Sequence, residues 1–393
     1  MQTDTENQVH HAIELLVEHE AGEEHSHYDR SNFLFVEASQ PIAKLAADAE
    51  HLIGLSLKNV NRTPEGMFVA TVAGCLKADH AHLWVEPGLR VAGNVDFSSG
   101  NVEYKGDVCV IGNVVDLFKV NATGAVTIAG TIEAAEVSAG TDLTAKGGIA
   151  GREKGICRAN GKLTAKYISG ATVEVGGDVQ VLDEVSHARL VCGGRLKVTH
   201  RTIVASHITA NGGVECANLG APGAGAKTII EVGVDAQVRK LAQVTFPAVQ
   251  RMRHKAAQVR LSIEPLMRDQ KKLTVAQRER ATELLYQADE IEQEANDKDK
   301  ALRDAFERAQ AKRSTEIVVG GKLFAGTIVR LGELEQTIDN TADGPLTITL
   351  RDHEGTQQIA LVQTHSGSTR FIGGRPVRDP EMDAMRQQFS KAA

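Results

Sequence analysis

The amino-acid sequence predicts a mainly β protein built on a right-handed parallel β-helix, with an inserted antiparallel α-helical coiled-coil hairpin and a small α/β N-terminal cap. Gly-x-aliphatic triplets recur along residues 93–214. Residues 246–313 lack glycine and carry an apolar residue every three or four positions, and strand-like sequence returns at 316–338. The expected units are the cap (1–85), the β-helix (86–240), the helical hairpin (246–315), return strands that complete or flank the β-helix (316–375) and a tail (376–393).

The N-terminal cap mixes two kinds of pattern. VHHAIELLVEHEA (9–21) and PIAKLAADAEHLI (41–53) are typical of helices, whereas FLFVEAS (33–39) and GMFVATVAG (66–74) are typical of strands. A rod of stacked strands leaves unpaired edges at both ends, which invites polymerisation. We therefore expect this segment to cap one end and residues 345–375 to cap or flank the other.

The β-helix prediction rests on two series of residues that stay in phase. Glycines recur at intervals of 16 to 21 residues, and aliphatic residues at intervals of 17 to 19. This repeat is typical of a coil whose turns hold two or three short strands, with alternate side chains pointing inward and glycine at the corners. Seven or eight turns, stacked ~4.8 Å apart, make a rod roughly 35–40 Å long. The series are Gly106, Gly124, Gly140, Gly161, Gly177, Gly194 and Gly212, and Val120, Val137, Ile156, Val173, Leu190 and Ile208.

The length of the turns indicates the hand of the coil. Left-handed acyltransferase helices repeat an aliphatic residue about every six positions with little variation. The turns here vary from 16 to 21 residues and keep no such register. This difference favours the right-handed form.

Residues 246–313 are expected to form two antiparallel helices. A first apolar set keeps the alternating 3,4 spacing of a coiled-coil seam with Gln270 in one position, and a second set has charged Lys298 as its fault. Pro247 suits the first helical turn, and Pro265 should kink the first helix or break it in two. The seams are Val249, Met252, Ala256, Val259, Ile263, Leu266 and Leu273, and Ala281, Leu284, Ala288, Ile291, Ala295, Lys298, Leu302, Ala305 and Ala309.

The segment EIVVGGKLFAGTIVRLGELEQTI (316–338) returns to strand character. The hairpin is therefore predicted as an insertion, after which the chain rejoins the rod. PLTITLRDHEGTQQIALVQ (345–363) is typical of two further strands around the turn Asp352-His353-Glu354-Gly355, and the tail beyond Arg375 is expected to be a loose end.

Composition narrows the function classes. The net charge of -7 and the pI near 6.1 argue against a nucleic-acid binder, which usually has a basic balance. The five cysteines form no C-x-x-C pair, and four lie in strand-like apolar runs, as buried side chains in a reducing compartment do. No secretory leader is visible, and no apolar run approaches the ~18 residues of a membrane helix. We therefore predict a cytoplasmic protein without membrane insertion.

Two stretches match a known family: VAGCLKADHAHLWVEPGLRVAGNVDFSSGNVEYKGDVCVIGNV (72–114) and KVNATGAVTIAGTIEAAEVSAGTDLTAKGGIAGREKGICRANGKLTAKYISGATVEVGGDVQV (119–181). The order G-N-V-D-F, S-G-N-V, G-D-V-x-V-x-G-N-V is specific. It resembles the flagellar assembly protein A (FapA) family, a β-helix family long labelled as a domain of unknown function. The resemblance covers about residues 66–235, the hairpin and KLFAGTIVRLG; the first 65 residues match weakly. Where the family commonly has Gly-Gly, this chain has Val204-Ala205-Ser206-His207.

This resemblance implies a link to bacterial flagellar assembly and motility. The family has no established catalytic residues, so the resemblance assigns none here.

Two polar segments have the chemistry of a ligand site. Imidazole and carboxylate ligate zinc or nickel, but the leader's histidines and glutamates are arranged as in a polar loop and no H-E-x-x-H occurs. Gly220–Thr228 resembles the phosphate loop G-x-x-x-x-G-K-T, but Ala226 is an extra residue before the lysine, and TIIEVGV, which follows, is a strand. We predict neither a metal nor a cofactor. The leader residues are His10, His11, Glu18, His19, Glu20, Glu23, Glu24, His25 and His27.

A β-helix enzyme would use clustered carboxylates on one face, or a histidine between turns. Asp178 follows a Gly-Gly turn, where aspartate is ordinary, and the repeat length does not suit the hexapeptide acyltransferases. We therefore predict no catalytic residue. The residues compared are Glu174, Asp178, Asp183 and Glu184, and His187, His200 and His207.

The sequence thus predicts a non-enzymatic cytoplasmic scaffold or regulator that acts by protein–protein interaction and is linked to flagellar assembly. Long sheet faces and a projecting hairpin offer rigid surfaces to protein partners or to a second copy in a homo-oligomer. An equally favoured interpretation is that the two helices of the hairpin pack only against each other and bind no partner. One alternative is an enzyme acting on a polysaccharide or acyl donor, which needs a groove with paired carboxylates or an open metal. Another is a self-polymerising protein similar to the bactofilins, which needs exposed apolar ends.

Overall fold

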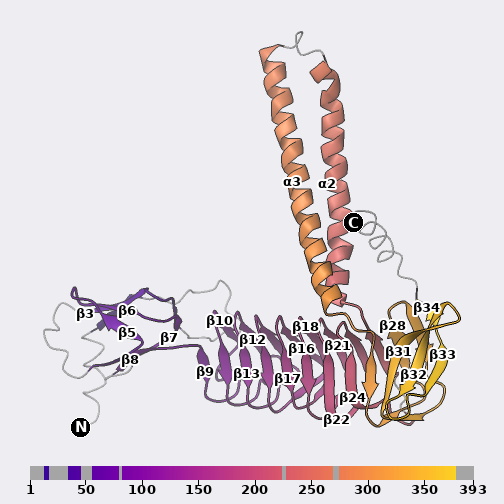
Figure 1. Cartoon of the computed structure of the whole chain (residues 1–393). Helices are drawn as coiled ribbons and strands as arrows, with labels where there is room; N and C mark the ends of the chain where they lie inside the picture. The colour runs from indigo at the N-terminus through magenta and orange to yellow at the C-terminus, as the bar shows by residue number, and fades with distance from the viewer. Residues whose placement is uncertain are drawn as a thin grey trace, which may run out of the picture.

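The computed structural model describes residues 13–16, 34–45, 55–78, 82–223, 227–268 and 274–377. Figure 1 shows a rod of stacked strands, a long helical hairpin standing on it, a pair of small sheets at the N-terminal end and a strand cap at the C-terminal end. The predicted β-helix with an inserted helical hairpin is therefore confirmed. The hand of the coil stays a prediction.

The N-terminal segment contributes strands where helices were predicted. Within 9–21 and 41–53, the described residues form β1 (Ile13–Leu15) and β3 (Pro41–Leu45), which pair with each other, so the helix prediction is corrected at these residues. Pairing in a sheet fully buries Ile42, whereas a short isolated helix is marginal in water. One sheet has the order β1-β3-β6 (Met67–Ala70)-β5 (Val60–Arg62), and the other β2 (Leu34–Val36)-β7 (Gly74–Ala78)-β8 (His82–Glu86)-β4 (Ser56–Lys58).

Each complete turn of the rod contributes strands to three parallel sheets. The first sheet stacks β9 (Leu89–Val91), β11 (Val108–Val110), β13 (Val126–Ile128), β15 (Leu143–Ala145), β17 (Leu163–Ala165), β19 (Val179–Val181), the starts of β22 (Leu196–Val204) and β24 (Val214–Leu219), and β26 (Ile317–Val319). The second stacks β10 (Val102–Tyr104), β12 (Lys119–Ala122), β14 (Glu136–Ala139), the ends of β16 (Ile149–Ala159) and β18 (Ile168–Val175), β21 (Arg189–Cys192), β23 (His207–Ala210), β25 (Ile229–Val232) and β28 (Ile328–Leu331). The third contains β20 (Val185–Ser186), β27 (Lys322–Leu323) and the remaining parts of β16, β18, β22 and β24.

The predicted glycine and aliphatic series stack from turn to turn along the rod, with one residue corrected in each series. In the aliphatic file, Val137 is paired with Cys157, which is completely buried, while Ile156 points outward and is half-buried. In the glycine file, Thr141 rather than Gly140 donates its N–H to Gly124 and accepts from Gly161. Both slips are of one residue, and a slip of one residue exchanges the faces of a strand.

The C-terminal segment covers the last turn of the rod. All three sheets end in an antiparallel strand: β29 (Leu334–Thr337) on β28, β30 (Ala342–Asp343) on β27 and β31 (Leu346–His353) on β26. The predicted hairpin around Asp352–Gly355 is confirmed, since β31 pairs with β32 (Thr356–Gln363), followed by β33 (Thr369–Gly373) and β34 (Arg375–Pro376). Residues 334–353 thus occupy the edges that would otherwise be open at this end.

The hairpin consists of α2 (Ala236–Arg268) and α3 (Val275–Ala311). The first helix begins earlier than predicted, so Pro247 lies inside it rather than in its first turn, and Pro265 does not divide it. Both prolines are on the exposed side of the helix, where a missing backbone hydrogen bond can be replaced by water. Thr274 begins α3 with a reciprocal capping box to Gln277.

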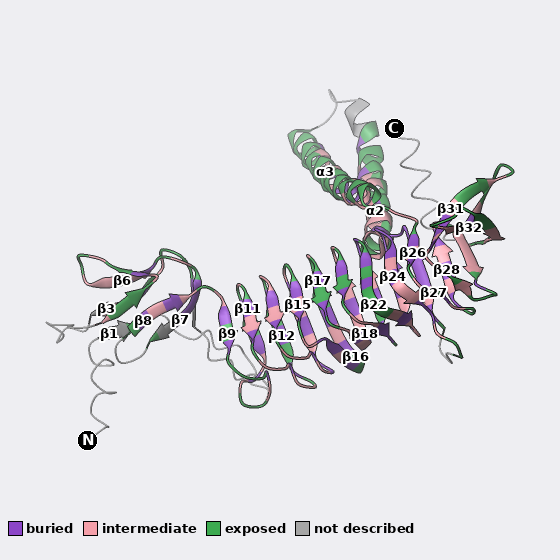
Figure 2. Cartoon of the chain, turned by 60° about the horizontal axis from the view of Figure 1, so that its bottom comes forward, coloured by how far each residue is buried: buried purple, intermediate pink, exposed green. Residues whose placement is uncertain are grey.

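The helices meet along a seam of residues spaced about a heptad apart. The seam differs from the prediction at one point: Asp299 is buried in it, whereas Lys298 is exposed and pairs with Glu294 at 3.2 Å. Figure 2 shows that most of the hairpin surface outside this seam is exposed, in contrast to the rod. The fully buried seam residues are Ala242, Val249, Ala256 and Ile263 in α2, and Ala281, Ala288, Ala295 and Leu302 in α3.

Candidate functional site at the root of the hairpin

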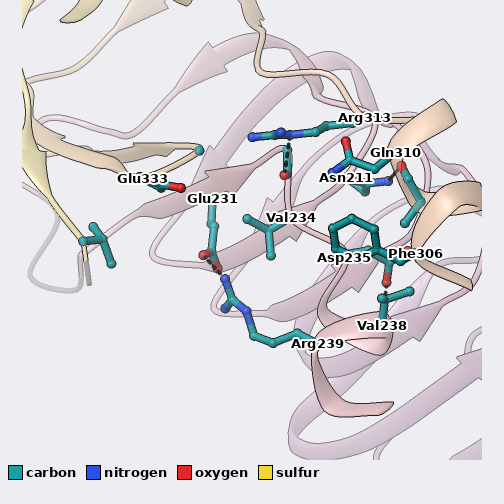
Figure 3. Close-up of a pocket in the computed structure, with 14 residues that line it drawn as sticks. Asn211, Glu231, Val234, Asp235, Val238, Arg239, Phe306, Gln310, Arg313 and Glu333 are labelled. Atoms are coloured by element: carbon teal, nitrogen blue, oxygen red, sulfur yellow. Dashed lines mark hydrogen bonds and ion pairs between the residues drawn. The ribbon is translucent and has the colours of Figure 1, made fainter. Parts of the chain in front are cut away.

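The hairpin leaves and rejoins the rod at one place, which Figure 3 shows in close-up. The strand β25 leads through Gly233 into α2, and α3 leads through Arg313 into β26. Gly233 has φ 77°, a left-handed conformation that favours glycine, and a Cβ there would collide with Thr315. The turn of the chain at Gly233 therefore sets the direction in which α2 leaves the rod.

A partly buried ion pair joins the first helix to the second sheet. Glu231 points outward from β25 but is only 8% exposed, because the helix covers it. One carboxylate oxygen lies 3.2 Å from Nη2 of Arg239, and the other accepts a hydrogen bond from Thr209 Oγ1 at 3.3 Å. Removing one partner of a buried pair leaves an uncompensated charge, so this contact fixes α2 on the rod.

Both helix ends at the root are satisfied by groups of the rod or of its connections. Asp235 caps α2, since its Oδ1 accepts hydrogen bonds from the N–H groups of Gln237 at 2.9 Å and Val238 at 3.0 Å. Asn211, 2% exposed, donates from Nδ2 to the carbonyl of Ala309 at 2.6 Å, near the end of α3. Terminal helix carbonyls otherwise lack partners, so this bond holds α3 against the second sheet.

Two further contacts complete the root. Arg313 donates from Nε to the carbonyl of Gly233 at 3.1 Å, which ties the exit of the hairpin to its entry. Lys240 lies with Nζ 2.9 Å from Glu174, several turns nearer the N-terminal end of the rod. The hydrogen bond from Lys240 is the main cause that lowers the pKa of Glu174. The root therefore spans several turns and resists tilting of the arm along the rod.

The root encloses little free space. Its cavity has a volume of about 60 Å³ and is lined by paired groups, including Asn211, Glu231, Arg239 and Arg313. Such a volume holds only a few water molecules. The arrangement orients the helical arm, and the free space at its root is small.

Asp178, one of the carboxylates considered for catalysis, belongs to a ladder along the rod. Its Oδ1 accepts a hydrogen bond from the N–H of Arg195, one turn further on, at 2.9 Å. A Cβ on Gly194 would collide with the same oxygen, so glycine is required there. This explains the recurrent Gly-Asx pair. Asn94, Asp107, Asn113, Asp142 and Asn218 make the equivalent bond to the amide that follows a glycine in the next turn.

The other candidate carboxylates are spread around one turn and are not brought together. Glu174 lies in β18 and Asp178 precedes β19, while Asp183 and Glu184 lie between β19 and β20. The Oδ1 of Asp183 is 3.5 Å from Nδ1 of His200. Asp183 and Glu174 each pair with a different basic side chain, and the four carboxylates do not converge on one point as an acid and a base would.

The three histidines are also separated. His187 is an exposed corner residue with φ 49°, and His200 lies exposed in the middle of β22. His207 is half-buried on β23, and within the described residues its buried Nε2 has no hydrogen-bond partner. Burial is the main cause that lowers its pKa.

The sequence contains two segments with ligand-like chemistry, the phosphate-loop-like segment 220–228 and the polar leader. Thr228, at the end of the phosphate-loop-like segment, comes directly before the strand β25, and its Oγ1 accepts a hydrogen bond from Ala205 N at 2.9 Å. The histidines and glutamates of the leader lie outside the described residues. Among the residues that the structure describes, no three metal-binding side chains form a cluster, and no helix is long and apolar enough to cross a membrane.

A groove lies on the first sheet. It has a volume of about 510 Å³ and crosses β15, β17, β19 and β22. Its lining contains threonines, Gln180 and the lysines Lys146, Lys166 and Lys197, together with Leu182, which is 48% exposed. The lining includes no carboxylate, so this groove lacks the acid–base pair of a glycan-cleaving β-helix.

The molecule is a β-solenoid protein with a coiled-coil insertion, because it consists of a rod of parallel strands with a helical arm anchored on it. The family model described as the Flagellar Assembly Protein A beta solenoid domain matches residues 87–355, and the chain therefore belongs to this family. The predicted resemblance is confirmed. No curated protein and no solved structure matches the chain significantly.

The departure from the family's Gly-Gly pair now has a structural description. Ala205 has φ 50°, within the left-handed region that glycine adopts at least cost. The fold of the family is therefore kept here with an alanine in a corner position suited to glycine.

Proposed function

We propose that this protein is a non-enzymatic scaffold or regulator, which acts in flagellar assembly by holding its helical arm at a fixed angle for protein partners. The observation that carries the proposal is the root of the hairpin. Glu231, Asn211 and Arg313, which anchor the arm, are paired with groups of the helices or the rod. A rigid root is useful when the direction of the arm matters to a partner.

The family supplies the process. Its name associates the chain with flagellar assembly, and the proposed compartment is the cytoplasm. The cysteines agree with a reducing compartment: burial is the main cause that raises the pKa of Cys157 and of Cys216 to about 12, so both thiols stay protonated inside an aliphatic core.

The two alternatives have less support. An enzyme acting on a polysaccharide or acyl donor would need a converging set of groups, and the candidate carboxylates and histidines lie on separate elements. A self-polymerising rod would need open ends, whereas β29, β30 and β31 cover the last turn.

Deleting the arm tests the proposal. Because Arg313 and Gly233 are joined by a hydrogen bond, residues 236–312 can be replaced by a short Gly-Ser linker without moving β25 and β26 apart. The native gene of a flagellated host that encodes this protein would be replaced by the deleted form. We expect fewer flagella per cell and reduced swimming at unchanged protein level.

A second variant separates the direction of the arm from its presence. E231Q with R239Q keeps the helices but removes the ion pair between Glu231 and Arg239 at the root, and we expect an intermediate phenotype. K197Q with E215Q removes an exposed ion pair on the first sheet, where Lys197 Nζ lies 2.7 Å from Oε1 of Glu215, and serves as the matched charge-neutralising variant away from the root. Normal flagellation in the arm-deleted cells would refute the proposed role of the arm.

A further inference from the structure

The two sides of the hairpin seam have different chemistry. In an α-helix, residues three and four places after a seam residue lie on opposite sides of the seam. Arg253 follows buried Val249 by four places, and its Nη2 is 3.0 Å from Oδ2 of Asp299. Arg260 follows Ala256 in the same way and lies 2.7 Å from Oδ1 of Asp289. This side, the charged flank, is closed by ion pairs within the hairpin.

On the opposite side, which we call the apolar flank, the described residues form no ion pair between the two helices. It carries the residues three places after the seam residues, namely Met252 and Val259 in α2 and Leu284 and Ile291 in α3. All four are half-buried, so each leaves part of its apolar surface in water. Lys298 is the one charged residue in an equivalent position. An apolar stripe of this length on a two-helix arm is a surface for a further helix or helices.

The two helices that border the apolar flank carry opposite net charges. The sequence of α2 contains seven Lys or Arg and one Glu, whereas α3 contains ten Asp or Glu and six Lys or Arg. Lys255 and Glu294 each come one place before a seam residue, and this places both on the rim of the apolar flank. The flank is therefore bordered by a basic helix on one side and an acidic helix on the other.

We propose that the apolar flank binds the same flank of a second copy of this chain, giving a dimer whose two hairpins form a four-helix bundle. A twofold axis parallel to the arms places α2 of each copy against α3 of the other. Basic and acidic rims then meet on both sides of the bundle. A twofold axis across the arms would instead place α2 on α2 and bring like charges together, so the parallel arrangement is the one that charge selects.

The contacts inside the hairpin fix the level at which the copies meet. Arg260 lies beside Asp289 and Arg253 donates to Asn296, so the levels of the two helices are known along the arm. By the same count, Lys255 is level with Glu294. In the bundle, Lys255 of one copy therefore faces Glu294 of the other, and this occurs twice by symmetry.

The first test measures the oligomeric state of the full chain by sedimentation equilibrium over a range of concentrations. We expect a dimer, and we expect V259E with I291E to yield monomers. L261E with Y286E introduces the same change on the outer faces, where these residues are 64% and 73% exposed, and should leave the dimer intact. Circular dichroism of all variants checks that the helices are kept. A monomeric wild-type chain, or a dimer unaffected by V259E with I291E, overturns the proposal.

A charge exchange gives a second, independent test. K255E alone and E294K alone each place like charges together twice in a homodimer, and we expect the dimer Kd of each to rise at least tenfold, equivalent to about 1.4 kcal/mol. In a mixture of the two variants, a heterodimer joins opposite charges at both contacts, so it should form with near wild-type affinity. Failure of the mixture to restore the dimer also overturns the proposal. The flagellar role is tested separately by the arm deletion, and neither outcome decides the other.

Discussion

At the scale of residues, the rod is held in register by a device that the sequence shows as Gly-Asx. The side-chain oxygen of one turn accepts from a backbone N–H of the next turn, and glycine leaves room for it. The two residue types need each other, because any Cβ at the glycine would displace the oxygen. This coupling accounts for the recurrence of Gly-Asp-Val and Gly-Asn-Val along the rod.

Asp178 allows a direct test of this device. We expect D178A to lower the free energy of unfolding by about 1–2 kcal/mol, since the N–H of Arg195 loses its acceptor. D178N keeps an oxygen in the same place and should stay within about 0.5 kcal/mol of wild type. Urea denaturation measures both. Equal losses for the two variants would show that the charge, and not the acceptor, matters.

His207 should make stability depend on pH. Its folded-state pKa is lowered by burial and by Arg189 and Arg330, with Glu231 acting in the opposite direction. As the pH falls through about 6.5, the unfolded chain binds a proton at this histidine while the folded chain still resists it. Protonation therefore favours the unfolded state, and the free energy of unfolding decreases. H207Q has no imidazole to protonate, so it should not lose this stability. Between pH 7.5 and pH 5, the free energy of unfolding of wild type should therefore decrease more than that of H207Q. Parallel pH profiles of the two proteins would contradict the assignment.

At the scale of elements, periodicity predicts which segments form strands and helices but leaves one-residue ambiguities. Ile156 and Cys157 are adjacent and both apolar, so only the pairing with β14 decides which of them points inward. Lys298 and Asp299 are adjacent and both charged, and the arginines of the hairpin select Asp299 for the seam. The start of α2 had a readable signal, because Asp235 is a typical N-cap residue.

The buried carboxylate of the seam should stabilise the hairpin specifically. Asp299 is bound by Arg253 at 3.0 Å and Arg303 at 3.2 Å. D299A removes the buried acceptor that Arg253 and Arg303 share, and we expect a loss of about 2 kcal/mol in the stability of the helices. Amide hydrogen exchange across 236–311 should detect it as faster exchange there, with the rod unchanged. D297A, at an exposed position two residues away, should exchange like wild type.

At the scale of the whole molecule, the sequence predicts the order of the units but not the contacts between them. The root joins β25, α2 and the end of α3 through Glu231, Asn211 and Arg313. These residues are far apart in sequence and follow no motif, because their proximity depends on which turns of the rod the arm returns to. The same holds for Glu174 and Lys240, which meet only because α2 lies across several turns. The hairpin as an insertion was predictable, and its anchorage was not.

The C-terminal cap should determine whether the rod stays separate from other rods. Without residues 334–393, the strands β26, β27 and β28 would expose unpaired N–H and C=O groups on all three sheets at once. We expect this truncated chain to associate end to end in a concentration-dependent manner. Sedimentation velocity should detect species that are larger than any species formed by the full chain. Removal of residues 378–393 alone leaves β29, β30 and β31 in place and should sediment like the full chain. If both truncated forms behave alike, the antiparallel strands are not what closes the rod, because only the longer deletion uncovers the last turn.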